Sequence, residues 1–197
     1  MNSQAADLII SNMRAYIYDN EPTDPRLPHE AIPSIPISID VLDKLGVQHV
    51  TIPTEEDWEA GINKLADERD YKSRDALDIS RAGLGDEFED KLRGFWTEHL
   101  HEEEEIRYVL EGSGYFDVRE GNTTDKWIRI AVTAGDLLIL PPGIYHRFSV
   151  GQEGKAHLVR LFKDKPFWTA LYRNEETDAS VFNKQYVETY NARLLST

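Results

Sequence analysis

Between Phe95 and Phe162, short apolar runs alternate with turn sequences at intervals of roughly ten residues. The runs are rich in Ile, Val, Tyr, Phe and Trp, which favour β-strands: IRYVLEG, GYFDVRE, WIRIAV, DLLILPPG, HRFSV and AHLVRLF. The sequences EGSG, EGNTTDK, TAGD, LPPG and GQEG separate them as turns. This pattern predicts antiparallel hairpins assembled into a sandwich or barrel.

The chain before this region predicts shorter, mixed elements. An extended run, Ala15 to Tyr18, precedes the proline-rich connection EPTDPRLPHEAIPSIPIS, in which regular structure is excluded. Capping residues then predict peripheral helices. The first follows Ser38 and runs through Leu45 to a stop at Gly46, the second follows the pair Thr54 and Asp57 towards Arg69, and the third spans Glu87 to Arg93.

The last segment, from Asp178 to Leu195, allows two interpretations. It predicts either a terminal helix packed outside the barrel or, through VFNKQYV, one more strand. Apolar runs this short do not separate the two by periodicity.

Composition limits the classes of protein that this chain can represent. Its 197 residues suit one domain, and a 40% hydrophobic content is enough for a packed core. The net charge of −14 disfavours nucleic acid and anionic membrane surfaces as partners. Cysteine is absent, so the side chains left for a metal are histidines and carboxylates, which favour Fe, Mn, Ni, Cu or Zn.

The sequence EHLHEEEEIR, residues 98–107, carries the strongest chemical signal. On a strand, His99 and His101 point to the same face because side chains alternate. If the pairing resumes in register, Glu105 faces the same interior, and Arg107 follows on the cavity side. The competing interpretation is a solvated acidic run with two incidental histidines.

A fourth candidate ligand, His146, follows the Gly- and Pro-rich turn LPPG. Three neutral imidazoles and one carboxylate suit a divalent first-row ion, and an octahedral ion would keep two adjacent positions for water or substrate oxygens. His99, His101, Glu105 and His146 are therefore the predicted metal ligands of a catalytic site.

Together these two motifs resemble the cupin family. The first is His99-x-His101-x3-Glu105-x6-Gly112, and the second is Gly135-x5-Pro141-x-Gly143-x2-His146. The chain departs from the family pattern at Gly94, one residue closer to the first histidine than usual, and at Val150, where Asn is common. The resemblance implies a mainly β protein, a double-stranded β-helix or jelly-roll barrel with a few peripheral helices and a metal inside one mouth.

Within the cupins, the chain resembles the acireductone dioxygenases of methionine salvage. The resemblance runs from about Met13 to Tyr186 and is most specific between His99 and Phe148. It implies cleavage of 1,2-dihydroxy-5-(methylthio)pent-1-en-3-one by O2, with one Fe(II) per chain, to 4-methylthio-2-oxobutanoate and formate. With Ni(II) as the alternative metal, it implies methylthiopropanoate, formate and carbon monoxide. Another cupin dioxygenase acting on a chelating enol, or a metal-binding cupin without turnover, are the alternatives.

Five further residues are candidates for the reaction. An enediolate needs local positive charge, for which Arg107 is the first candidate and Arg160 the second, the latter with a surface ion pair as its alternative role. Glu98 is a candidate to orient a water or a histidine, or to accept a substrate proton. Phe95 and Phe148 are candidates for an apolar wall around the thioether tail, with plain barrel core as the alternative. We treat the remaining histidines as structural: His29, His49 and His157.

The first twelve residues precede the usual start of that family, so we expect either a disordered extension or initiation at Met13, followed by one domain over residues 13–197. No apolar run is long enough to cross a membrane. We therefore expect a cytoplasmic monomer, small enough also to enter the nucleus, whose partners are the acireductone and O2.

Overall fold

The computed structural model describes residues 13–121, 124–166 and 169–194. Its strands are β1 (Arg14–Ile17), β2 (Gln48–Thr51), β3 (Ser73–Ile79), β4 (His99–Leu100), β5 (Glu105–Arg119), β6 (Trp127–Thr133), β7 (Asp136–Leu140), β8 (His146–Val150), β9 (Ala156–Phe162) and β10 (Leu171–Tyr172). Its helices are α1 (Ile39–Lys44), α2 (Trp58–Arg69), α3 (Arg81–Leu84), α4 (Phe88–Trp96), α5 (Glu175–Asp178), α6 (Val181–Tyr186) and α7 (Ala192–Leu194), with a 3-10 turn at Gly85–Glu87 and a π turn at Val187–Asn191.

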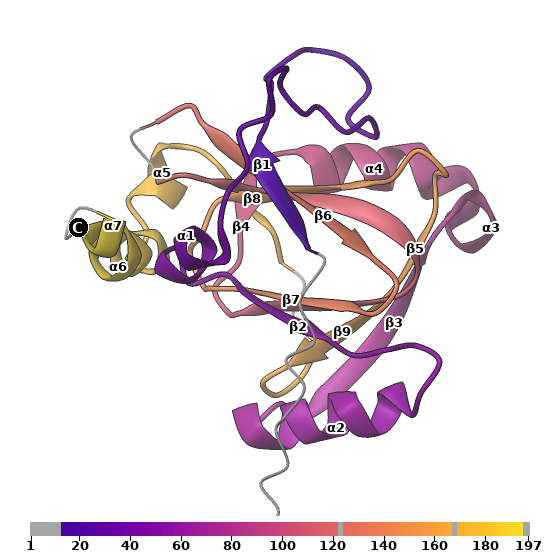
Figure 1. Ribbon diagram of the computed structural model, residues 1–197. Helices are drawn as coiled ribbons and strands as arrows, with labels where there is room; N and C mark the ends of the chain where they lie inside the picture. Colours follow the sequence, from indigo (N-terminus) through magenta and orange to yellow (C-terminus); the bar gives the residue numbers. More distant parts are fainter. Residues whose placement is uncertain (1–12, 122–123, 167–168, 195–197) are drawn as a thin grey trace, which may run out of the picture.

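Two antiparallel sheets pack against each other and share β5, so the predicted mainly β jelly roll is confirmed (Figure 1). The first half of β5 pairs with β7 and β9, and its second half pairs with β6 and β8. One sheet has the order β2-β7-β5-β9-β3, and the other has the order β1-β6-β5-β8-β4-β10. Strand β5 therefore belongs to both sheets, and its inward-facing side chains line the space between them.

The sequence EGSG was expected to be a turn between two strands, and this expectation is wrong. Strand β5 continues through it, with a register shift between Val109 and Glu111. Gly112 has φ +81°, and a Cβ there would lie 2.4 Å from the Lys155 carbonyl oxygen. The glycine therefore lets the strand bend from one sheet into the other beside a neighbouring backbone.

Alternating side chains divide β5 between two apolar layers. Val109, Phe116 and Val118 lie in the core between the sheets. Ile106 and Tyr108 point to the opposite face, where α2 covers them with Ile62 and Trp58. Because the period is two, Glu105 and Arg107 share the inward face with Val109, which places charged side chains at one end of the sandwich.

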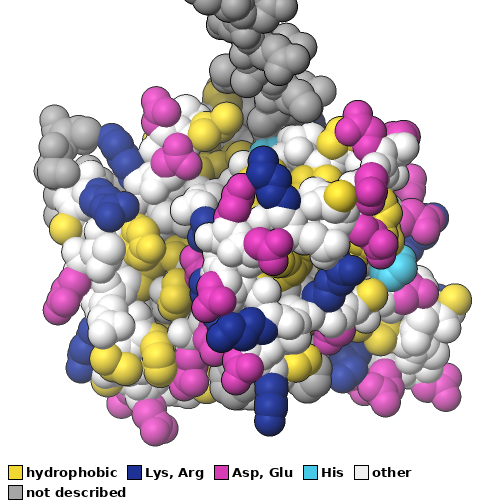
Figure 2. Space-filling model, turned by 90° about the horizontal axis from the view of Figure 1, so that it is seen from below, with side chains coloured by type: hydrophobic (Ala, Val, Ile, Leu, Met, Phe, Trp, Pro, Cys, Tyr) yellow, Lys and Arg dark blue, Asp and Glu magenta, His cyan; other side chains and the backbone are white. Residues whose placement is uncertain are grey.

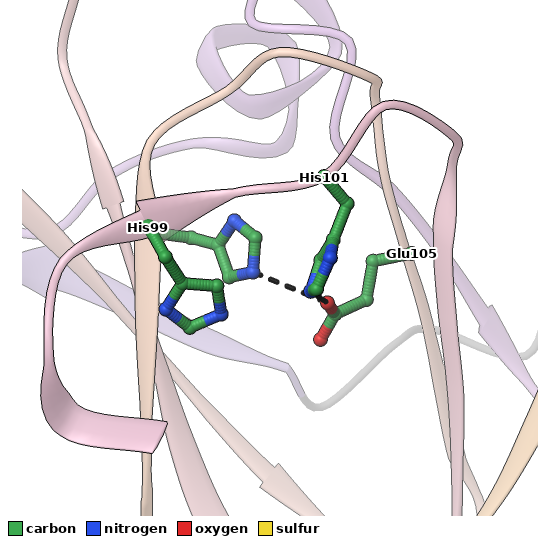
Figure 3. Close-up of side chains that lie close together, drawn as sticks. His99, His101 and Glu105 are labelled. Carbon is green, nitrogen blue, oxygen red and sulfur yellow. Dashed lines mark hydrogen bonds and ion pairs between the residues drawn. The ribbon is translucent and has the colours of Figure 1, made fainter. Parts of the chain in front are cut away.

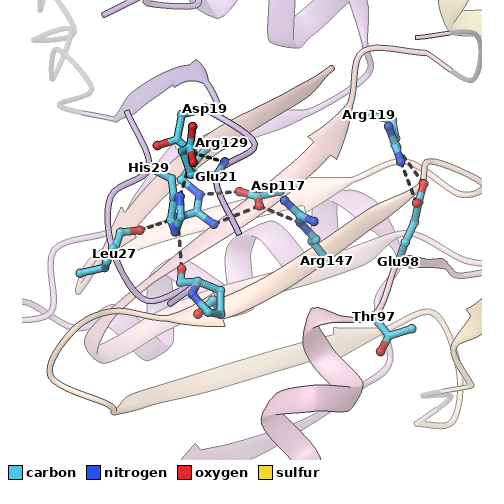
Figure 4. Close-up of polar contacts among 12 residues, drawn as sticks. Asp19, Glu21, Leu27, His29, Thr97, Glu98, Asp117, Arg119, Arg129 and Arg147 are labelled. Carbon is cyan, nitrogen blue, oxygen red and sulfur yellow. Dashed lines mark hydrogen bonds and ion pairs between the residues drawn. The ribbon is translucent and has the colours of Figure 1, made fainter. Parts of the chain in front are cut away.

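The outer face of the second sheet holds a buried ionic network instead of an apolar layer (Figure 4). Asp117 accepts from Arg129 Nε at 2.7 Å and from Arg147 Nε at 2.9 Å, and both Asp117 and Arg129 are fully buried. Arg129 also donates to the Leu27 carbonyl at 2.6 Å. A buried guanidinium is costly unless its N–H groups are hydrogen-bonded. The bond from Arg129 to the Leu27 carbonyl therefore holds the proline-rich connection against this sheet.

The helices agree in place with the predictions but differ in detail. The helix after Ser38 ends as predicted before Gly46, which has φ +80°. Asp57 caps α2, accepting from the Ala60 amide at 3.1 Å, so the cap is not Thr54. Strands β2 and β3 were not predicted from the sequence.

The C-terminal segment is helical, so the alternative of a further strand is wrong. Its helices α5, α6 and α7 lie at the same end of the sheets as α1 (Figure 1). The predicted extension, residues 1–12, lies outside the described residues, and a domain boundary at Met13 stays a prediction. Within the described residues, no helix is both long and apolar enough to cross a membrane.

Candidate metal centre

The four predicted ligands converge between the two sheets. His99 on β4 is the register partner of His146 at the start of β8, and Glu105 begins β5. One ligand atom from each of the four residues lies within 4.8 Å of every other. Figure 3 shows the side chains of His99, His101 and Glu105 turned toward one another.

The separations suit one small cation. Glu105 Oε2 lies 2.8 Å from His101 Nε2 and 3.1 Å from His146 Nε2. Metal–nitrogen and metal–oxygen bonds of about 2.1 Å place neighbouring ligands at right angles about 3 Å apart. The spacing is therefore that of adjacent ligands on a single ion.

Backbone carbonyls fix the tautomer of all three histidines. His99 Nδ1 lies 2.6 Å from the Thr97 carbonyl oxygen, His101 Nδ1 lies 2.8 Å from that of Thr169, and His146 Nδ1 lies 3.0 Å from that of Ile144. A carbonyl can only accept, so each Nδ1 carries a hydrogen and each neutral ring presents its Nε2 lone pair to the others. Lone pairs and a carboxylate that converge in this way suit a cation between them, and a bound metal ion would supply that charge.

Burial and local charge favour the metal-binding protonation states of His99 and Glu105. Burial, together with the neighbouring His146, lowers the pKa of His99 to about 3. Burial alone would raise the pKa of Glu105, but the neighbouring Arg107 guanidinium holds it well below its usual value. The site thus offers a neutral imidazole and an ionised carboxylate at neutral pH.

A cavity of about 730 Å³ opens onto this group. Its lining includes three of the four candidate ligands, His99, His101 and Glu105, together with apolar side chains such as Phe95, Phe148 and Leu158. Phe148 packs between Phe95 and Phe116, with ring centroids 6.3 and 4.7 Å away. The cavity therefore joins a metal-binding end to an apolar wall, which suits a ligand with a chelating head and an apolar tail.

Two arginines from paired strands line the same cavity. Arg107 and Arg160 are register partners on β5 and β9. Arg107 Nη2 lies 3.3 Å from Glu105 Oε2, while Arg160 donates two hydrogen bonds of 2.7 Å to Asp75. Arg107 therefore lies beside the Glu105 carboxylate, whereas the charge of Arg160 is paired with Asp75.

Glu98 occupies a different position. It does not line this cavity, and its two oxygens accept from Arg119 Nε and Nη2 at 2.8 and 2.9 Å. Arg173 Nη1 donates a further bond of 2.8 Å to it. These arginines outweigh the effect of burial and lower the pKa of Glu98. Its catalytic role stays a prediction.

The sequence did not single out four residues that line the cavity or support the residues next to the candidate ligands. Tyr172 lines the cavity beside His99, with ring centroids 6.1 Å apart, and Thr169 supplies the carbonyl for His101. Arg119 and Arg173 hold Glu98. Neither Arg119 nor the segment at residues 169–173 belongs to a motif with a recognisable spacing. The sequence therefore could not indicate these contacts. Two of the three histidines that we treated as structural are paired elsewhere, His29 with Asp19 and His49 with Asp136.

The chain is similar to known proteins over most of its length. Residues 14–170 match the model of the ARD/ARD′ family. The acireductone dioxygenase 1 of Coprinopsis cinerea is 47% identical over 175 residues, which are 89% of this chain and 96% of that protein. The acireductone dioxygenase of Saccharomyces cerevisiae is 44% identical over 182 residues, which are 91% of this chain and 98% of that protein.

One solved structure shares the fold. It is described as an acireductone dioxygenase from Bacillus anthracis with a cadmium ion in its active centre. The TM-score is 0.64, at 18% sequence identity, and the alignment covers 81% of this chain and 98% of that one.

Proposed function

This chain belongs to the ARD/ARD′ family, and from that premise we propose that His99, His101, Glu105 and His146 hold the Fe(II) ion of an acireductone dioxygenase. One observation carries the proposal. Three histidines and one glutamate converge in a chain that is 47% identical to an acireductone dioxygenase over 89% of its length. A bound metal would supply two adjacent positions at which the oxygens of a substrate enediolate bind.

The activity is oxidative cleavage of 1,2-dihydroxy-5-(methylthio)pent-1-en-3-one by O2. Carbon 1 leaves as formate, and the remaining five carbons form 4-methylthio-2-oxobutanoate, so both oxygen atoms enter products. The 2-oxo acid is the precursor of methionine in the salvage pathway. Both the substrate and O2 are small molecules, in keeping with a cavity of about 730 Å³.

The choice between iron and nickel is the finer part of the proposal. Three imidazoles and one carboxylate accept either ion, since both take nitrogen and oxygen ligands. With Ni(II), the expected products are methylthiopropanoate, formate and carbon monoxide. We take Fe(II) as the working metal because only its products return carbon to methionine.

Arg107 is the proposed catalytic cation. It lines the cavity two residues after the ligand Glu105, and its guanidinium lies on the metal side. Positive charge held there in advance stabilises the negative charge of the enediolate without reorganisation of water. Arg160 is the second candidate, and its pairing with Asp75 reduces the charge it can offer.

Phe95 and Phe148 are the proposed wall for the methylthio tail. Both line the cavity, and their rings contact each other edge to face. An apolar wall binds the tail by burying it, and it keeps water away from the oxygen-sensitive head. Phe148 is also part of the core, so its two roles overlap.

For partners and location we propose a cytoplasmic monomer that binds neither nucleic acid nor membranes. The net charge of −14 supports this proposal. On the face in Figure 2, Lys and Arg side chains are interspersed with Asp and Glu instead of forming one basic surface. A phosphate backbone would therefore meet as much repulsion as attraction on that face.

Oxygen uptake tests the proposal. Protein stripped of metal and then loaded anaerobically with one equivalent of Fe(II) should consume O2 when the acireductone is added, faster than the acireductone oxidises alone. The metal-free protein and His146→Ala treated in the same way should match the spontaneous rate. Equal uptake by all three samples would contradict the proposal.

A further inference from the structure

His101 depends on a part of the chain that lies far from it in sequence. The carbonyls that accept from His99 and His146 come from residues two positions before each histidine. The acceptor for His101 is Thr169, sixty-eight residues away. The orientation of this one ring is therefore set by how the segment after β9 lies on the site.

Strand β10 holds that segment in place. It pairs with β4 in the register Tyr172 to His99 and Leu171 to Leu100. The Arg173 amide donates to the Glu98 carbonyl at 3.1 Å, and its guanidinium donates to the Glu98 carboxylate at 2.8 Å. Arg119 donates to both oxygens of this carboxylate (Figure 4), so the two arginines share Glu98 Oε1. A two-residue strand has few ladder bonds, so the ion pair beyond its end contributes much of its attachment.

The turn before His146 is held from the same segment. Asn183 on α6, 1% exposed, donates from Nδ2 to the Gly143 carbonyl at 3.0 Å. The Gly143 amide in turn donates to the His101 carbonyl at 3.0 Å. A Cβ on Gly143 would lie 2.2 Å from the Phe182 carbonyl oxygen, so α6 lies directly against this turn.

A third contact closes the segment on itself. Tyr145, next to His146, donates to Asp178 at 2.7 Å, and Arg173 Nε lies 3.4 Å from the same carboxylate oxygen. The Thr177 hydroxyl donates to the Tyr172 carbonyl at 2.9 Å. Strand β10 and the helix α5 are thereby tied together, and both contact residues next to the metal-binding histidines.

We propose that residues 169–186 form a clamp that positions the histidines of the metal centre, with Arg173 and Asn183 as its positioning residues. Arg173 acts through Glu98 on strand β4, which holds His99 and directly precedes His101. Asn183 acts through Gly143 on the turn of His146. Neither residue lies in the region that matches the family model, which ends at residue 170. The inference rests on the proposed metal site, but on neither the identity of the metal nor that of the substrate.

Binding of Co(II) to the metal-free full chain tests the clamp, because its visible spectrum reports the ligand geometry and no turnover is needed. Loss of an outer hydrogen-bond partner weakens metal binding by about 10-fold to 100-fold. We expect Arg173→Ala and Asn183→Leu each to raise the Kd for Co(II) by about 10-fold or more, with an altered spectrum. Arg173→Lys, which keeps one charged donor, should recover part of the affinity.

Val50→Ala is the control for a general loss of stability. Val50 packs in the second apolar layer, under α2. At a comparable loss of unfolding free energy, it should leave the Kd and spectrum of bound Co(II) unchanged. If Asn183→Leu fails to fold, the partly buried Arg173 still provides a test of the clamp. A Kd within twofold of the parent for Arg173→Ala, or an equal loss in Val50→Ala, would overturn the proposal.

The result is separable from the activity. Protein that binds Co(II) tightly but does not cleave the acireductone would contradict the proposed function and leave the clamp standing. Protein that cleaves the acireductone, with Co(II) affinity insensitive to Arg173, would contradict the clamp alone.

Discussion

His99 lies directly opposite His146, because the two residues are register partners on β4 and β8. Their ring centroids are 4.4 Å apart. A single backbone pairing thus joins the two halves of a site that are far apart in the sequence. The ligand geometry therefore depends on the register of these two short strands as well as on the ligand side chains.

Removal of one ligand should abolish metal binding. His146→Ala deletes a buried donor whose place no other side chain of the described residues can take, so we expect less than one tenth of the parent metal content after dialysis. Elemental analysis of the purified protein measures this. His157→Ala, a histidine on the neighbouring strand β9 and outside the metal group, is the matched control. Equal metal content in both variants would contradict the four-ligand site.

Replacement of Arg107 should separate metal binding from turnover. Arg107→Ala leaves all four ligands in place, so metal content should stay at the parent level. Loss of one preorganised charge or donor commonly costs about 100-fold to 1,000-fold in rate, and we expect a fall of this order in kcat. Arg74→Ala, on the exposed side of β3, is the control arginine. Full activity in Arg107→Ala would remove its proposed role.

Replacement of Phe95 and replacement of Phe148 should differ in their effect on the free energy of unfolding. Phe148 is 6% exposed and packs in the core, so Phe148→Ala should lower the unfolding free energy by about 3 kcal/mol or more. Phe95 is only half buried, so Phe95→Ala should cost less. Both should raise KM for the acireductone by roughly 10-fold if they contact its tail. Urea unfolding and steady-state kinetics measure the two effects, and an unchanged KM in both variants would leave only the core role.

The stability of the metal-free protein should fall as the pH decreases from about 6.5 towards 3. His99 has a pKa near 6.5 in the unfolded chain and about 3 in the fold, because it is buried beside His146. Between these values the unfolded state binds a proton that the folded state does not, so acid favours unfolding. The effect is on the order of a few kcal/mol, at about 1.36 kcal/mol per pKa unit.

Urea unfolding at several pH values, with metal removed, measures this dependence. His99→Gln lacks the titrating group and should show a flatter profile over the same range. Parallel profiles for the parent and His99→Gln would show that His99 does not carry the effect.

The local pattern of the chain was enough to predict most strands and to select the four candidate ligands that the fold brings together. Alternation in IRYVLEG, WIRIAV and AHLVRLF predicts strands, because each buries one or both faces of a sheet. The spacing of His99, His101 and Glu105 places them on one face by the same period. The bend in β5 could not be predicted, since Gly112 in EGSG has the composition of a turn and only the neighbouring Lys155 backbone shows that the strand continues.

The contacts around the ligands depend on the tertiary fold. The pairing of Glu98 with Arg119 and Arg173 joins three segments, and nothing local to any of them indicates the others. Strand β3, SRDALDI, lies at a sheet edge and has three charged residues among its seven, so its sequence resembles a polar connection. Asp75 on this strand nevertheless forms an ion pair with Arg160, which lines the cavity.

Product analysis tests the central claim most directly. The protein is loaded separately with Fe(II) and with Ni(II), given the acireductone and O2, and its products are separated by chromatography, with carbon monoxide measured in the headspace. We predict 4-methylthio-2-oxobutanoate and formate with iron, and methylthiopropanoate, formate and carbon monoxide with nickel. Product formation no faster than the spontaneous oxidation with either metal would contradict the account.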